Sequence, residues 1–198
     1  DGIEVCAGPR HIGSLPEAMT PERRTTIRDL LIQHNMGVPA TFATTIHVFE
    51  PDAGKHAEDL ELAKRLADLM RAFVPEREPV LAFGIGGRTH EWLKIRDVIA
   101  EQARAFGDLA ERDGFRIAVE AHSGAAVERS NRALWLIEEI GQERVRLHFD
   151  MVHFYLAGES VEEAVPALVP ITGHTHVTDT LVHADGNRDL PVSYTHLR

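Results

Sequence analysis

The sequence predicts an α/β fold built on a parallel sheet. Short runs rich in apolar and β-forming residues begin near residues 3, 41, 80, 117, 145 and 171. The segments between these runs carry apolar residues at helical spacing, so strands and helices alternate strictly along the chain. Such alternation with short connections is typical of parallel strands joined by right-handed crossovers.

The first two strands are predicted at residues 2–6 and 40–46, from their β-forming residues. A helix begins at Thr20, because threonine suits the N-cap and Pro21 suits the first turn. A second helix is predicted over residues 60–73, where apolar residues keep helical spacing. The apolar side of the first helix is predicted to hold Ile27, Leu30 and Leu31.

The third strand is predicted at residues 80–83 and leads into a glycine-rich loop at residues 84–87. A long helix follows and ends at Gly114, as expected where a left-handed residue terminates a helix. The fourth strand is predicted at residues 116–119, and the next helix at residues 133–140.

The last two strands are predicted at residues 145–149 and 171–177, with a capping-box signature from Ser160 to Glu163 between them. The chain therefore holds six βα units. Six units fit either a doubly wound open sheet or a barrel with parts missing, because a complete (β/α)8 barrel needs eight units and typically ~250 residues.

The composition indicates one domain and restricts the partners. The 198 residues are 43% hydrophobic, and the net charge is −10 with scattered Lys and Arg, which argues against binding to nucleic acid. Cys6 is the only cysteine, so no intrachain disulfide forms, and this predicts a reducing, cytoplasmic location. No signal peptide is visible, and no apolar run approaches the ~20 residues that cross a bilayer.

Three residues carry the main functional signal. Glu120, Asp150 and His176 each end an apolar run and lie 30 and 26 residues apart, about one βα unit. In a parallel barrel these strand ends converge on one mouth, where two carboxylates and an imidazole suit a divalent metal. Each residue alone has a simpler interpretation: a strand-end glutamate in an ion pair, a capping aspartate and a satisfied core histidine.

Further candidates flank these three residues. His122 and His153 share the predicted mouth and are candidate substrate contacts. Asp179 either orients a metal ligand or caps a turn. Arg88 follows the glycine-rich loop, which lacks the lysine of a P-loop and is first of all an ordinary loop. Alternatively, Arg88 reaches an anionic or hydroxylated substrate.

These motifs resemble the xylose isomerase-like TIM barrel superfamily, in particular its sugar phosphate isomerase/epimerase branch. Members carry a glutamate at the end of strand five, Asp-x-x-His after strand six and His-x-x-Asp after strand seven, matching Glu120, Asp150 with His153, and His176 with Asp179. The resemblance implies an incomplete (β/α)8 barrel holding strands two to seven. The barrel domain is expected at residues 1–191, with a non-native tail at residues 192–198.

The resemblance also implies a metal-dependent isomerase or epimerase of a sugar, sugar phosphate or cyclitol. Glu120 would be both catalytic base and metal ligand beside Asp150 and His176, with Mn²⁺ or Mg²⁺ favoured and Co²⁺ or Zn²⁺ as alternatives. A fourth ligand, a glutamate after strand eight, is expected to be missing. The 198-residue chain is therefore expected to bind Mn²⁺ weakly without turnover, and a homo-oligomer is expected only of a longer protein.

Two alternatives remain open at this point. An endonuclease IV-like zinc hydrolase of abasic DNA shares Asp-x-x-His and His-x-x-Asp, but it needs more histidine ligands and a basic surface. The other is an inactive barrel fragment that binds small molecules. A small carbohydrate or cyclitol is the favoured partner, with neither nucleic acid nor membrane.

Overall fold

The computed structural model describes residues 1–11, 13–185 and 188–189. A six-stranded sheet forms its centre, with the strands parallel and in the sequential order β1-β2-β3-β4-β5-β6. This sequential order excludes a doubly wound sheet and confirms the predicted α/β fold. The expected tail at residues 192–198 lies outside the described residues. The six strands are β1 Val5–Ala7, β2 Thr41–His47, β3 Val80–Gly84, β4 Arg116–Glu120, β5 Val145–Asp150 and β6 Thr172–His176.

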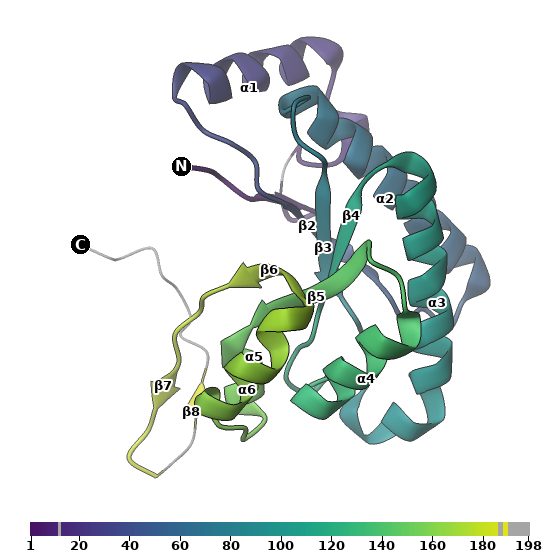
Figure 1. The fold of residues 1–198 in the computed structure, drawn as a ribbon. Coiled ribbons are helices and arrows are strands. Elements are labelled where there is room, and N and C mark those ends of the chain that lie inside the picture. Colours follow the sequence, from purple (N-terminus) through teal and green to yellow (C-terminus); the bar gives the residue numbers. More distant parts are fainter. Residues whose placement is uncertain (12, 186–187, 190–198) are drawn as a thin grey trace.

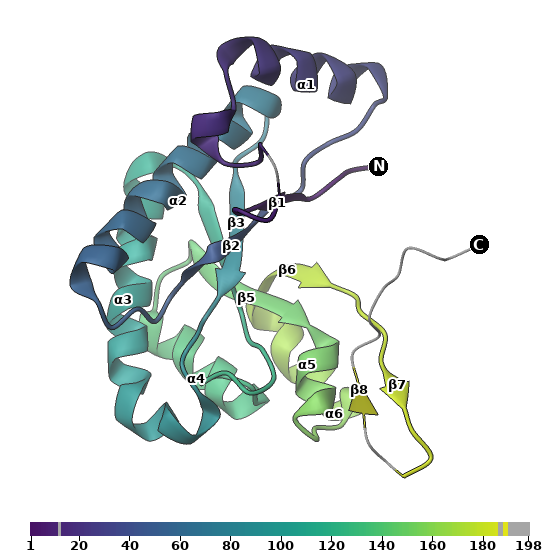
Figure 2. The same cartoon turned by 180° about the vertical axis from the view of Figure 1, so that it is seen from behind.

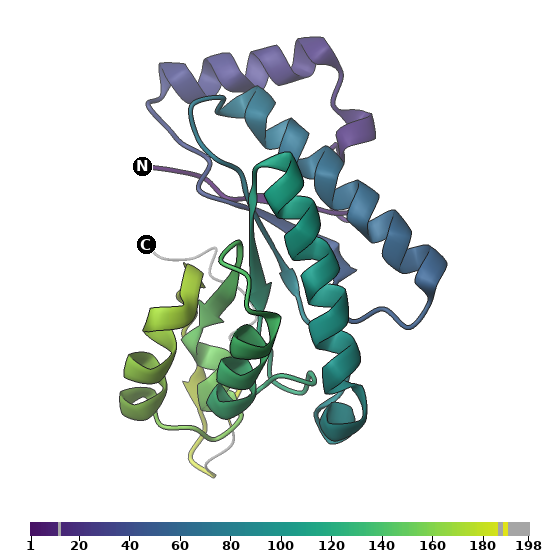
Figure 3. The same ribbon diagram turned by 45° about the vertical axis from the view of Figure 1, so that its right-hand side comes forward.

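The sheet is curved and open, with β1 and β6 at its two edges (Figures 1 and 2). The larger helices cover its outer face, and Figure 3 shows three of them, α2, α3 and α4, side by side there. The helices are α1 Pro21–Gln33, α2 Ala53–Phe73, α3 Trp92–Asp113, α4 Ser130–Ile140, α5 Met151–Leu156 and α6 Val161–Leu168. Short 3-10 turns are η1 Pro16–Ala18, η2 Thr89–Glu91 and η3 Val169–Ile171. In the described part of the chain, no helix is long and apolar enough to cross a membrane.

The hydrophobic core lies between the sheet and the helices on its outer face. Helix α3 buries Ile99 and Phe106 completely, and Phe106 packs against Phe83 of β3 with ring centroids 4.9 Å apart. The left-handed Gly114 ends α3 as the sequence predicts, with φ of +71°. This packing fixes the strand ends that carry the functional side chains.

Helix α1 differs from the other long helices because it buries no residue. Of its predicted apolar side, Leu30 is 49% exposed, and Ile27 and Leu31 are only half-buried. The helix lies over the β1 edge and packs mainly against α2, which leaves Leu30 largely uncovered by the described residues.

A short antiparallel hairpin follows β6 and was not predicted. Its strands are β7 Leu181–Val182 and β8 Arg188–Asp189. Two-residue strands are too short to produce an alternating hydrophobic pattern, so the sequence carries no periodic signal for them.

Candidate metal centre and adjoining cavity

The ends of β4, β5 and β6 bring three predicted residues together. Because the strands are parallel, Glu120, Asp150 and His176 leave the sheet at the same edge, and Asp150 pairs with His176 in register. One side-chain ligand atom from each of the three lies within 4.8 Å of the other two. The structure therefore groups them, while their roles as ligands stay a prediction.

Glu120 is a buried carboxylate without a hydrogen-bond donor in the described part of the chain. Its side chain is 9% exposed. Its Oε1 lies 4.0 Å from Nδ1 of His148, 3.9 Å from Nε2 of His153 and 4.0 Å from Nδ1 of His176. These distances are too long for hydrogen bonds and suit ligands on either side of a shared ion. Burial raises the pKa of Glu120 to about 7, and the charge of Asp150 adds to this while His176 opposes it.

Asp150 caps a helix with one carboxylate oxygen and places the other oxygen at the site. Its Oδ1 accepts the backbone N–H of Val152 at 3.2 Å and so caps α5. Its Oδ2 accepts the hydroxyl of Thr178 at 2.8 Å and lies 4.0 Å from Nε2 of His153. The cap holds the carboxylate in place and leaves Oδ2 directed at the neighbouring imidazole.

A third acidic residue, Glu4, contacts His176 from the other side. Glu4 precedes β1, and its two carboxylate oxygens contact Nε2 of His174 at 3.0 Å and Nε2 of His176 at 2.6 Å. Burial raises the pKa of Glu4, but these two hydrogen bonds outweigh it and lower the pKa to about 2. An ionised carboxylate only accepts, so Nε2 of both histidines carries a proton. The hydrogen bond to Glu4 also raises the pKa of His176. Nδ1 of His176 faces Glu120, and its lone pair is available to a cation when the ring is neutral.

Glu4 was not predicted as a member of the site. A charged residue inside the first predicted strand, between Ile3 and Val5, was the available signal, because an acid within a strand needs a partner on its face. Its partners lie 170 and 172 residues away, and only the curvature of the sheet brings them within reach.

His153 and His122 stack on each other beside Glu120, with ring centroids 3.7 Å apart. His153 is buried and its Nδ1 has no hydrogen-bond partner among the described residues. Burial, with the neighbouring His122, lowers the pKa of His153 to about 4, so this ring is neutral at pH 7. His122 is exposed, and its Nδ1 lies 2.9 Å from the carbonyl oxygen of Ser123. Both predicted substrate contacts therefore lie at the site.

His148 precedes Asp150 by two residues on β5. It pairs with Glu120 in register and is fully buried. Neither of its ring nitrogens has a hydrogen-bond partner in the described part of the chain, and burial lowers its pKa to about 3. It forms a second close group with His174 and His176. In that group, however, Nε2 of both partners is already bound to Glu4, so the Glu120 group is the better-prepared cation site.

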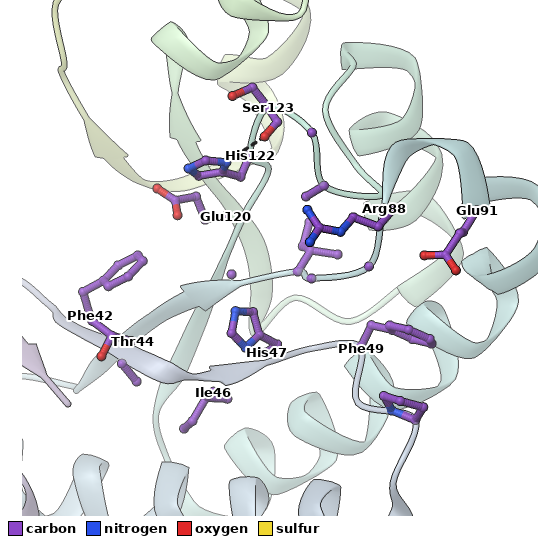
Figure 4. Close-up of a pocket in the computed structure, with 18 residues that line it drawn as sticks. Phe42, Thr44, Ile46, His47, Phe49, Arg88, Glu91, Glu120, His122 and Ser123 are labelled. Atoms are coloured by element: carbon purple, nitrogen blue, oxygen red, sulfur yellow. Dashed lines mark hydrogen bonds between the residues drawn. The ribbon is translucent and has the colours of Figure 1, made fainter. Parts of the chain in front are cut away.

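A cavity of about 810 Å³ adjoins the three residues, and Glu120 is part of its wall (Figure 4). Phe42 and His47 of β2, Arg88 of the loop after β3 and His122 also line it. The exposed Arg88 therefore lies at the cavity, and its role as a substrate contact stays a prediction. Asp179 is exposed and its Oδ1 accepts the N–H of Thr180 at 2.8 Å, which matches the turn-capping alternative.

The residues present fit a divalent ion. Glu120 is a nearly buried carboxylate that lacks a hydrogen-bond donor in the described residues, and a cation would compensate its charge. Two carboxylate oxygens and one imidazole nitrogen form a mixed ligand set that suits Mn²⁺ or Mg²⁺ and also accepts Zn²⁺. The hydrogen bond from His176 to Glu4 is the orienting contact that metal-binding histidines commonly make.

Comparisons with known proteins identify the family to which the fold belongs. A family model described as a xylose isomerase-like TIM barrel matches residues 1–196. A search of curated proteins found no match. Among solved structures, the IOLI protein with a bound zinc atom is 19% identical with a TM-score of 0.73, covering 99% of this chain and 66% of its own.

Two further structures show the same fold. D-psicose 3-epimerase in the presence of D-fructose is 16% identical with a TM-score of 0.69, covering 94% of this chain and 66% of its own. A xylose isomerase-like TIM barrel protein from Mycobacterium smegmatis in complex with magnesium is 19% identical with a TM-score of 0.66, covering 89% and 64%. The chain thus spans slightly less than two thirds of the length of these structures. The match over residues 1–196 and the sequential parallel sheet show that the chain belongs to the xylose isomerase-like TIM barrel family.

Proposed function

We propose that this chain forms the catalytic part of a divalent-metal-dependent sugar isomerase or epimerase. The observation that carries the proposal is that Glu120 belongs both to the Glu120, Asp150 and His176 group and to the wall of the 810 Å³ cavity. A cavity of this size accommodates a hexose. A structure of the same fold, D-psicose 3-epimerase with D-fructose, supports a carbohydrate as substrate.

Glu120 is the proposed base. Its carboxylate forms part of the cavity wall and has no hydrogen-bond donor among the described residues, so it can accept a proton from a substrate in the cavity. Its Oε1 would take the proton from the carbon next to the substrate carbonyl. The neutral His153, 3.9 Å from Oε1, would donate or accept a hydrogen bond at a substrate hydroxyl without adding charge.

Glu120, Asp150 and His176 would hold the metal, and His122 with Arg88 would line the path of the substrate. A bound divalent ion would polarise the carbonyl and hydroxyl oxygens of the sugar. Phe42 packs beside the imidazoles of His148 and His176, with its ring centroid 5.8 Å from each of theirs. Mn²⁺ and Mg²⁺ are the favoured ions in this proposal.

The first test measures metal binding and does not depend on turnover. Metal-free 198-residue protein is titrated with MnCl₂ by calorimetry, comparing wild type with Asp150→Asn and with the exposed control Glu101→Gln. Removing a ligand should weaken binding more than the ~10–100-fold that follows loss of a merely orienting group. Unchanged Mn²⁺ affinity in Asp150→Asn would remove the metal site from the proposal.

The second test follows proton transfer directly. A panel of ketoses and inososes is incubated in D₂O with this chain and with a version extended to the length of the similar structures, and NMR detects deuterium next to the carbonyl. Mn²⁺-dependent exchange is expected in the extended protein, lost with EDTA and reduced ~10²–10⁴-fold by Glu120→Gln. Exchange that persists in Glu120→Gln would show that another residue is the base.

A further inference from the structure

Arg88 is a cationic side chain at the cavity without an ion-pair partner in the described part of the chain. Figure 4 shows its guanidinium directed into the cavity, toward the side that carries Glu120 and His122. Glu91 also lines the cavity, yet no ion pair joins it to Arg88. By contrast, Arg144 contacts both Glu78 and Glu111. Arg88 thus presents its guanidinium to the cavity without an ion-pair partner among the described residues.

The loop that carries Arg88 also leaves its backbone donors free. The carbonyls of Gly84, Ile85 and Gly86 accept N–H groups from Val48, Phe49 and Ala126, which anchors the loop from behind. Among the described residues, the N–H groups of Gly86, Gly87 and Arg88 donate no hydrogen bond. An anchored loop with unused amides beside a guanidinium forms a wall of hydrogen-bond donors.

Glycine is required in this wall for two reasons. Gly86 and Gly87 have φ of +80° and +67°, a region that other residues rarely adopt. A Cβ on Gly84 or Gly86 would lie 3.3 Å from the His47 side chain, so a larger residue would displace it. Glycine at these positions therefore leaves room for the His47 side chain at the cavity.

The two ends of the cavity differ in charge. Glu120 lies at one end, next to Asp150 and the proposed cation, whereas Arg88, the free amides and the neighbouring His47 form the other end. We infer that the Arg88 end binds an anionic group, a carboxylate or a phosphate, carried by the same substrate whose carbonyl lies at Glu120. This inference rests on the proposed function for the carbonyl end and names a ketose with an anionic terminus as the substrate class. Arginine recognises both kinds of group through two parallel N–H bonds.

The test measures binding with three probes, D-fructose, D-fructose 6-phosphate and D-fructuronate, by calorimetry on the Mn²⁺-loaded chain and on the metal-free chain. We expect at least one anionic probe to bind ~10-fold or more tightly than D-fructose. Arg88→Gln should weaken that probe ~10–100-fold, as expected when a hydrogen-bonded charge pair is removed, and should change D-fructose binding less than twofold. The control Arg28→Gln, on α1, should change neither.

The two anionic probes distinguish a phosphate from a carboxylate. Tighter binding of either one supports the inference and identifies the preferred group. Equal binding of all three probes, or an equal loss of D-fructose and anion binding in Arg88→Gln, would overturn it. Anion binding through Arg88 without Mn²⁺-dependent deuterium exchange would leave this subsite standing and reject the proposed function. Exchange on D-fructose with no effect of Arg88→Gln on any probe would support the proposed function and reject the anion subsite.

Discussion

Two carboxylates lie on opposite sides of the His176 ring, and their surroundings differ. On the β1 side, Glu4 accepts hydrogen bonds from His174 and His176 at 3.0 and 2.6 Å, and its pKa falls to about 2. On the β4 side, Glu120 lies 4.0 Å from the same ring without a hydrogen-bond donor in the described residues, and its pKa rises to about 7. The two carboxylates therefore differ in protonation, because Glu4 is less buried and has hydrogen-bond donors that offset desolvation, whereas Glu120 has none among the described residues.

This difference indicates different roles for the two acids. Glu4 stays ionised and orients His176, so that Nδ1 points at Glu120. Glu120 stays uncompensated and is ready to take a proton or a cation. Removing either acid, or changing the contacts around it, tests whether the two carboxylates have these different roles.

The largest expected effect concerns Glu120 and the stability of the metal-free protein. Its raised pKa means that its stabilising contribution is present below pH ~4.5 and is lost as the pH rises through about 7. Glu120→Gln is uncharged at every pH, so its stability relative to wild type should rise by ~3 kcal/mol between pH 4.5 and pH 8. Urea unfolding with EDTA at both pH values measures this.

Glu101→Gln, an exposed change on α3, serves as the control and should show no such trend. If the stability difference between Glu120→Gln and wild type stays constant with pH, the pKa of Glu120 is not raised. Another group would then offset the desolvation of its carboxylate.

The next effect concerns Glu4. Glu4→Gln removes the ionised acceptor, so His176 loses its fixed tautomer and Mn²⁺ affinity should fall ~10–100-fold. Calorimetry measures the affinity, and ¹⁵N NMR of the His176 ring reports which nitrogen carries the proton. Glu17→Gln is the matched control, since Glu17 pairs with Arg65 on the exposed surface at 3.3 Å. A mixed tautomer in wild type would contradict the orienting role.

The smallest effect concerns the second contact of Asp150. Thr178→Val keeps the shape of the side chain but removes the hydroxyl that donates to Oδ2 at 2.8 Å. The loss of ~1 kcal/mol in holding the carboxylate should weaken Mn²⁺ binding about fivefold. Thr175→Val, an exposed change on β6, should leave the affinity unchanged. If Thr178→Val tightens Mn²⁺ binding, the hydroxyl competes with the ion for Oδ2.

Local patterns were enough to predict the strands and three members of the site. The β-forming runs located all six strands of the central sheet to within three residues, because strand and helix periodicities are properties of neighbouring residues. The similar spacing of Glu120, Asp150 and His176, 30 and 26 residues apart, then predicted that they converge at parallel strand ends, and the structure groups them within 4.8 Å. Their chemical roles remain predictions.

Tertiary structure decided what depends on distant segments. The exposure of Leu30 follows from the position of α1 beside only one helix, which periodicity does not report. The unpaired state of Arg88 depends on which side chains meet at the cavity. The contact of Glu4 with His174 and His176 joins the two edges of the sheet across 170 residues, and it exists only because the sheet curves. Sequence patterns record which face a residue occupies, whereas curvature and packing decide which faces meet.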